Sequence, residues 1–282
     1  MQHIEFIDTN HFERNYFRKK AASSLSLFID FFWETDFGHL WKQNPSGFSD
    51  VLFPNTGYTY LLNLGTPFVM QVGDKKFPMK TDGFLPRSQV IECFHKPGNR
   101  LFGVKFKTSP IIFEKKINFA EYRASIFPLS YLADVSIIKT TKAAGSFSER
   151  VKLMSEYFNG TIQQYSGSLL PVQIVTQILA EFDQENNFSR SVEELATQYN
   201  VSSRTLQRYF ETYTGISTKN VLQILRVRKA VEALVLSPDT FDHTHFGYYD
   251  HSHFYKHLKK FLQKSTLEKM QLHIPLLAKL HK

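Results

Sequence analysis

The sequence predicts an α+β protein in which an amino-terminal β-sandwich or barrel is followed by an all-α domain with two helix-turn-helix motifs. Its 282 residues exceed the usual size of one domain, about 100 to 200 residues, so two domains are expected. Residues 25–106 hold short apolar runs between turn-forming residues, whereas apolar residues recur at helical spacing from residue 171 onward. We therefore expect a β-rich domain over residues 1–133, a helical linker over 134–170 and the helical domain over 171–282.

Composition and charge restrict the kinds of protein to consider. Cys93 is the only cysteine, which excludes an internal disulfide framework and fits a reducing compartment. No apolar run reaches the roughly 18 residues of a membrane span, and the amino terminus lacks the order of a signal peptide, so we expect a cytoplasmic protein without a membrane partner. The net charge is +8, and residues 190–282 contain 14 Lys and Arg but only 8 Asp and Glu. This surplus suits a polyanionic partner.

The first domain is expected to be antiparallel. Its apolar runs are LSLFIDFFW, DVLF, YTYLLNL, PFVMQV, QVIECF and RLFGVKF, and the turns between them are expected at Gly47 and at residues 55–57, 73–74, 82–83 and 97–99. The many phenylalanines fill a core on one interpretation and line a pocket for a small effector on the other. Only His39 and His95 lie between residues 25 and 106, without a His-x-His pair, so no metal and no cofactor are expected there. Cys93 is expected to be a buried small hydrophobe.

The linker is expected to contain one amphipathic helix. Phe147, Val151, Met154 and Phe158 recur at near-helical spacing, and residues 159–160, Asn-Gly, are expected to end the helix. Its apolar face either packs on the barrel or forms a dimer contact. A further helix then opens the second domain near Pro171, with a core stripe of Val172, Val175, Ile178, Leu179 and Phe182.

A helix-turn-helix is expected over residues 191–215. Ser191 and Glu194 form a capping-box pattern, Ser202 or Ser203 offers a second N-cap, and Gly215 is a natural stop. In the second helix the apolar side consists of Leu206, Phe210 and Tyr213. The opposite side holds long donors of the kind that reach base edges in the major groove of DNA. The residues expected to contact DNA here are Ser203, Arg204, Gln207 and Arg208.

A second recognition element is expected after a long helix over residues 217–236. Asp250 is a good N-cap, and Phe254, Leu258 and Phe261 form the apolar stripe that follows it. The polar residues left to contact DNA are His251, Ser252, Tyr255, Lys256 and Lys259. His253 and His257 stand one helical turn apart, which zinc accepts, but no second ligand cluster accompanies them.

Three segments of this region resemble the DNA-binding domain of the AraC/XylS transcription regulators: SVEELATQYNVSSRTLQRYFETYTGIS, RVRKAVEAL and GYYDHSHFYKHLKKF. The resemblance implies a sequence-specific, double-stranded-DNA-binding regulator, more often an activator acting with RNA polymerase. It also implies a cupin-like first domain that senses a small effector or forms a homodimer. Two segments depart from the family pattern, PDTFDHTHF before the second motif and LQKSTLEKMQ after it, so that motif is expected to be distorted or to contact mainly phosphates. The protein is not expected to be an enzyme; the alternative is a cupin-like metalloenzyme with a helical appendage.

Overall fold

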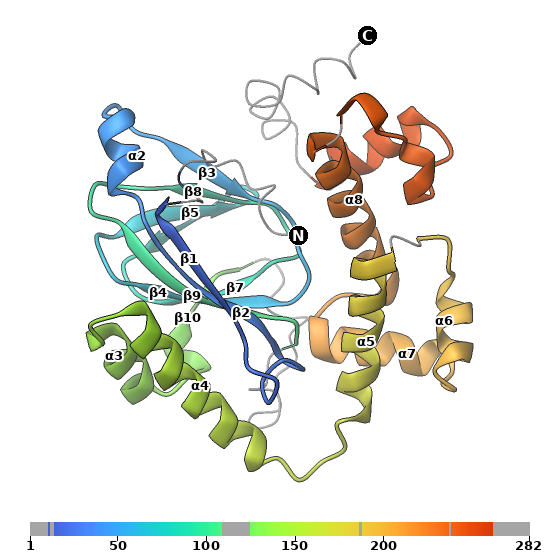
Figure 1. The fold of residues 1–282 in the computed structure, drawn as a ribbon, viewed down its shortest axis with the longest axis horizontal. Helices are drawn as coiled ribbons and strands as arrows, with labels where there is room; N and C mark the ends of the chain where they lie inside the picture. The colour runs from blue at the N-terminus through green and yellow to red at the C-terminus, as the bar shows by residue number, and fades with distance from the viewer. Residues whose placement is uncertain (1–10, 12–13, 109–124, 186–187, 237, 262–282) are drawn as a thin grey trace.

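The computed structural model describes residue 11 and residues 14–108, 125–185, 188–236 and 238–261, and these form a β-rich part and a helical part side by side (Figure 1). The expected departure at LQKSTLEKMQ, residues 262–271, and the first ten residues lie outside this range. Within the described part of the chain, no helix is both long and apolar enough to cross a membrane.

The β-rich part is a sandwich of two antiparallel sheets, as predicted. The first sheet has the order β1 (Tyr16–Lys20), β2 (Ile29–Asp36), β9 (Arg100–Phe106), β4 (Tyr58–Asn63), β7 (Gly83–Pro86) and β10 (Phe127–Pro128). The second has the order β3 (Ser49–Leu52), β8 (Ile91–Phe94), β5 (Phe68–Val72) and β6 (Lys75–Met79), and the short helix α2 (Gly38–Gln43) precedes β3. Residues of both sheets share one buried cluster, which includes Leu61, Leu101, Met70 and Ile91. The sheets therefore enclose a common core.

The turn predictions were mostly confirmed. Gly47, Gly57, Gly73 and Gly98 all have positive φ, and at Gly57 a Cβ would also stand 2.0 Å from the carbonyl oxygen of Phe106. The expected turn at residues 82–83 was wrong at its second residue. Gly83 begins β7, where a Cβ would stand 2.6 Å from the Met79 side chain, so the glycine serves close packing within the sheet.

Two helices cover one face of the first sheet (Figure 1). These are α3 (Val135–Ala143) and α4 (Phe147–Gln163). The predicted end of α4 at residues 159–160 was wrong, because the helix continues to Gln163 and buries Thr161. Phe158 of α4 contacts Tyr60 and Phe106 of the sheet, with ring centroids 6.0 and 5.2 Å apart. The apolar face of α4 is thus occupied by the sheet, the first of its two expected roles.

The helical part consists of α5 (Leu170–Glu185), α6 (Val192–Gln198), α7 (Ser203–Thr214), α8 (Thr218–Leu236), the 3-10 turns η4 (Pro238–Thr240) and η5 (His243–Phe246), and helical residues 251–261. The predicted core stripe of α5 is buried throughout. In Figure 1, α6 and α7 lie toward one end of α8 and the residues that follow α8 lie toward the other.

One contact between the two parts is made by the segment that follows β3, and another by Val172 of α5, which packs in the same core cluster as Phe106 of the first sheet. Phe53, which is 1% exposed, belongs to the core of the helical part and not to a core of the sandwich. Beside it, the guanidinium of Arg228 on α8 donates a hydrogen bond to the carbonyl of Pro54, at 2.9 Å. Arg228 is only 2% exposed, so a buried cation spans this contact.

Candidate nucleic-acid interface

Local capping shapes the first helix-turn-helix as the sequence predicts. The Ser191 hydroxyl accepts from the Glu194 backbone amide at 3.1 Å, and the Glu194 carboxylate accepts from the Ser191 amide at 2.7 Å. This capping box holds the pKa of Glu194 below its usual value, chiefly through the Ser191 backbone hydrogen bond. Ser202, not Ser203, caps α7 by accepting from Thr205 at 3.1 Å.

The turn between α6 and α7 depends on Asn200. Its φ is 52°, a left-handed conformation that asparagine tolerates better than most residues, and it is the sole non-glycine residue with positive φ in the described ranges. Gly215, with φ 73°, ends α7 in the same conformation. These two residues set where α7 begins and ends, and therefore which of its side chains lie on the surface.

A polar network that the sequence did not reveal fixes α6 against α5. The Glu181 carboxylate of α5 accepts from the Tyr199 hydroxyl and from the Arg190 guanidinium, the latter at 2.9 Å. Burial raises the pKa of Glu181, but the hydrogen bonds from Tyr199 and Arg190 outweigh it and hold that pKa below its usual value. Arg190 also donates to Gln198 at the end of α6, at 3.0 Å.

The predicted recognition residues of α7 share one exposed side. Leu206 and Phe210 are fully buried, while Arg204, Gln207 and Arg208 are exposed and Ser203 is half-buried. Gln207 donates to the Glu211 carboxylate at 3.1 Å, which orients its amide along the helix. All four predicted residues line one shallow hollow of about 750 Å³, together with Lys219 at the start of α8. The sequence did not single out Lys219, because its position depends on how α8 packs against α7.

The second recognition element is present in a shortened form. The segment expected to depart from the family pattern forms the short turns η4 and η5 in place of a full α-helix, and Gly247, with φ 71°, ends the second turn. Asp250 caps the helix that follows by accepting from the His253 amide at 2.6 Å. The stripe of Phe254 and Leu258 is buried.

The polar side of this helix matches the prediction for four of its five residues. His251, Ser252, Lys256 and Lys259 are exposed. Tyr255 is instead half-buried against the core, and the Lys259 ammonium lies 4.6 Å from the centre of its ring. Tyr255 therefore supports Lys259 and offers less surface to a partner than the sequence suggests.

A half-buried arginine braces the second element from beneath. The Arg226 guanidinium on α8 donates to the Phe188 carbonyl and lies 5.5 Å from the ring centre of Tyr248. Burial lowers the pKa of Arg226 and raises that of Tyr248. Neither residue stands out in the sequence, because nothing local shows that they meet.

Four of the five histidines of this region form two ring pairs. His243 and His251 have ring centroids 4.2 Å apart, and His253 and His257 have centroids 4.6 Å apart. Burial, with smaller contributions from His253, Arg226 and Lys260, lowers the pKa of His257. In the described ranges, the one cluster of three His, Cys, Asp or Glu side chains close enough to share a metal ion lies elsewhere, in the sandwich.

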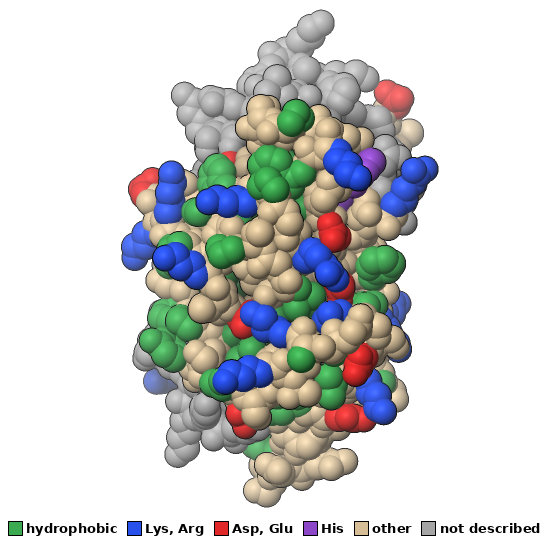
Figure 2. All heavy atoms as spheres, turned by 90° about the vertical axis from the view of Figure 1, so that its left-hand side faces the viewer, with side chains coloured by type: hydrophobic (Ala, Val, Ile, Leu, Met, Phe, Trp, Pro, Cys, Tyr) green, Lys and Arg blue, Asp and Glu red, His purple; other side chains and the backbone are tan. Residues whose placement is uncertain are grey.

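Cations are mixed with other side chains on the side of the molecule that faces away from the helical part (Figure 2). Figure 2 shows the side that lies at the left in Figure 1, with the strands and α3, and there Lys and Arg side chains are interspersed with Asp, Glu and apolar ones. No single-sign patch is visible on that face (Figure 2).

Comparison with known families matches residues 195–268 to the family described as "Helix-turn-helix domain". No curated protein sequence matches the chain. Solved structures that match include ToxT from Vibrio cholerae, at 9% identity over 88% of this chain and 93% of that chain with a TM-score of 0.41. They also include unsaturated fatty acid bound ToxT from the same organism (8%, 92% and 94%, 0.43) and the AraC-like transcriptional activator CuxR (8%, 79% and 89%, 0.27). The matched residues overlap the region whose three segments resemble the DNA-binding domain of the AraC/XylS regulators, and they identify this region as a helix-turn-helix domain.

Proposed function

We propose that this regulator binds a specific double-stranded DNA sequence, and that α7 is the helix that reads it. The observation that carries the proposal is the division of α7 into a buried side, Leu206 and Phe210, and an exposed side that holds Arg204, Gln207 and Arg208. Arginine forks suit guanine and the glutamine amide suits adenine, so these side chains match the donor and acceptor groups of the major groove.

The second element contributes mainly phosphate contacts in this proposal. Its exposed permanent cations on the polar side are Lys256 and Lys259, and lysine acts as a point charge, without the planar fork that recognises guanine. The 19 residues of α8 span about 28 Å, close to the roughly 34 Å of one DNA turn. Elements toward opposite ends of α8 would therefore reach the same face of the duplex.

Selection from random double-stranded DNA by the purified full-length chain tests the proposal. We expect one enriched motif, and we expect Arg208→Ala to lose about 1–3 kcal/mol of discrimination at one or two base pairs. The matched control is Lys152→Ala, which removes an exposed cation from α4 in the β-rich part. Recovery of no motif would contradict sequence-specific binding, and a uniform loss of affinity in Arg208→Ala would place that side chain at a phosphate.

Control by a small effector is the second part of the proposal. A cavity of about 670 Å³ lies between the two parts, with Arg18, Lys20 and Lys107 on the strand side and Thr176 and Ala180 on α5. Its volume falls in the range of small-molecule sites, about 300–1,000 Å³. A ligand in this cavity would contact both parts at once and would change the orientation of the helical part relative to the β-rich part.

Thermal unfolding against a panel of metabolites tests this control. A true effector should raise the midpoint of unfolding and change DNA affinity together, and Ala180→Trp, which fills the cavity from α5, should remove both effects. A ligand whose two effects survive in Ala180→Trp binds somewhere else.

Activation of transcription, through RNA polymerase, and assembly as a homodimer complete the proposed function, and both are supported by the family resemblance. Transcription in vitro from a template with the selected motif measures the sign of regulation, and sedimentation measures the oligomeric state. We assign no enzymatic activity to the chain.

A further inference from the structure

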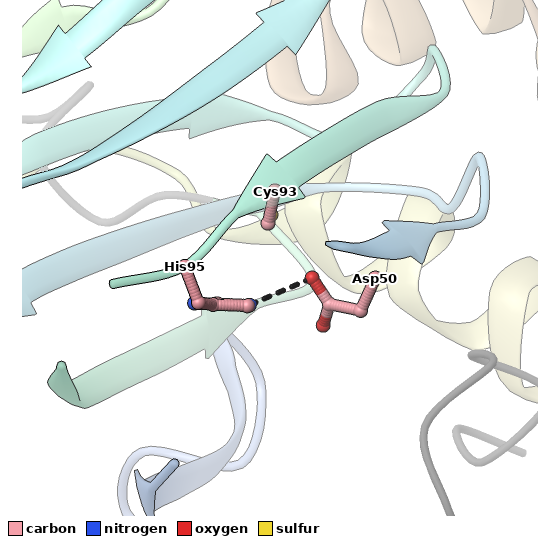
Figure 3. Close-up of side chains that lie close together, drawn as sticks. All are labelled: Asp50, Cys93 and His95. Carbon is pink, nitrogen blue, oxygen red and sulfur yellow. Dashed lines mark hydrogen bonds and ion pairs between the residues drawn. The ribbon is translucent and has the colours of Figure 1, made fainter. Parts of the chain in front are cut away.

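Three side chains with metal-binding atoms meet inside the sandwich. Asp50 of β3 pairs directly across the strands with Cys93 of β8, and His95 follows two residues later on the same face as Cys93. Figure 3 shows the His95 ring and the Asp50 carboxylate pointing toward each other, with the Cys93 side chain directed into the same space. The candidate ligand atoms all lie within 4.8 Å of one another, and all three residues are buried.

The orientation of His95 is the second observation. Its Nδ1 lies 2.7 Å from the Oδ1 of Asn99, and the amide nitrogen of Asn99 donates to the Thr66 carbonyl, so Oδ1 is an acceptor. Nδ1 therefore carries a proton, and Nε2 points at the Asp50 carboxylate, 2.8 Å away. A histidine that ligates a metal through one ring nitrogen usually donates a hydrogen bond from the other, which is the arrangement Asn99 provides.

The surroundings hold the ring in place and leave room beside it. Phe37 stacks on the His95 ring at 3.7 Å between centroids, and Phe48 and Phe68 flank it at 5.3 and 5.6 Å. The three side chains line a cavity of about 50 Å³, more than the roughly 10–15 Å³ that one water needs. An ion with one water ligand fits this space.

We propose that Asp50, Cys93 and His95 bind one divalent metal ion of the zinc type, with a water in the fourth position. A sulfur, a nitrogen and an oxygen donor in one site suit zinc. Binding releases the Cys93 thiol proton and the proton shared by His95 Nε2 and Asp50 to solvent; the resulting thiolate, carboxylate and neutral imidazole sum to a charge of −2, which a divalent ion balances. Tetrahedral zinc separates nitrogen and oxygen ligands by about 3.4 Å, so Asp50 must withdraw by roughly 0.6 Å from its present hydrogen bond.

Two cations that line the same cavity are already engaged. Lys105 donates to the carbonyls of Thr56 and Phe106, and Arg87 donates to the carbonyl of Phe53. Because the bound ion and its ligands would be neutral as a group, it adds no net charge beside these two side chains. The site does not depend on whether the chain binds DNA.

Cobalt(II) is the probe for the test, because a cobalt–thiolate bond gives a charge-transfer band in the near ultraviolet. Cys93 is the only cysteine of the chain, so such a band can come from no other place. The full-length protein is stripped with a chelator under reductant and titrated with Co²⁺. We expect the band to saturate at one equivalent and to disappear when Zn²⁺ is added. Absence of the band in the wild-type protein overturns the proposal.

Variants separate the site from histidines at the surface. Cys93→Ser should lose the band, and His95→Gln and Asp50→Asn should weaken Co²⁺ binding at least tenfold. The matched control is the double variant His253→Gln/His257→Gln, which removes one of the two close histidine pairs of the helical part and should keep the band unchanged. Zn²⁺ should also raise the unfolding midpoint of the wild-type protein but not that of Cys93→Ser. A band that survives in His95→Gln and Asp50→Asn with unchanged affinity would contradict the site.

Discussion

Replacing Phe53 with alanine should uncouple the β-rich and helical parts. Phe53 follows β3, yet its side chain is 1% exposed within the core cluster of α5 to α8. It is therefore an anchor that one part inserts into the other. Phe53→Ala removes the ring without touching the recognition side of α7.

The expected cost follows from the burial. Truncating a buried Phe to Ala costs about 3–5 kcal/mol. The neighbouring hydrogen bond from Arg228 to the Pro54 carbonyl involves a charged donor, so it contributes roughly 1.5–3 kcal/mol while the parts stay docked. A loss of about 3 kcal/mol raises the undocked population roughly a hundredfold.

The two tryptophans, Trp33 and Trp41, both lie in the β-rich part, whereas most helical residues lie in the other. Urea unfolding followed by tryptophan fluorescence and by helical circular dichroism therefore reports on the parts separately. In Phe53→Ala we expect the dichroism midpoint to fall and the fluorescence midpoint to hold. Phe28→Ala, an equally buried ring in the sandwich core, should do the reverse. A fall of both signals together in Phe53→Ala would refute the anchor.

Two further predictions concern charged side chains. Glu181→Gln should cost roughly 1.5–3 kcal/mol of stability at pH 7, because hydrogen bonds to a carboxylate are lost. Since folding lowers the pKa of Glu181, the advantage of the wild-type protein is complete above the usual carboxyl pKa and should vanish as pH falls through the folded-state pKa. Urea titrations of the wild-type protein and Glu181→Gln at several pH values measure this difference, with Asp183→Asn as the control. Lys256→Ala should weaken binding to all DNA sequences and reduce the slope of log affinity against log salt concentration by about 0.9. Losses at particular base pairs with an unchanged slope would contradict a phosphate contact.

Most of the helix-turn-helix could be predicted because its signals are local. The capping box of Ser191 and Glu194, the N-cap of Asp250 and the stop at Gly215 each depend on residues a few positions apart. These contacts involve only residues close together in the chain, so they can be predicted from the sequence without knowing the fold. The error at the end of α4 has the opposite cause, because packing on the sheet carries the helix past Gly160.

Two edge strands, β1 and β6, escaped prediction for a physical reason. β1, with the sequence YFRKK, and β6, with KKFPM, each pair with one neighbour and expose most of their side chains. An edge strand of this kind has little apolar alternation, and its lysines discourage pairing with other chains. The interior strands β4 and β9 coincide with apolar runs of the sequence, and so does the edge strand β3. The interior strand β7 was missed, because its first residue, Gly83, was expected in a turn.

The cluster of Asp50, Cys93 and His95 could not be predicted from the sequence. Cys93 and His95 are two residues apart, but Asp50 lies more than 40 positions away, and only the register of β3 against β8 places it opposite Cys93. A slip of one residue would turn Asp50 to the other face of its sheet, because successive strand residues alternate. A metal site with one histidine and a distant aspartate has no His-x-His spacing that would indicate it in the sequence. The chemistry of this sandwich depends on pairing between distant strands, whereas that of the helix-turn-helix depends on neighbours in the chain.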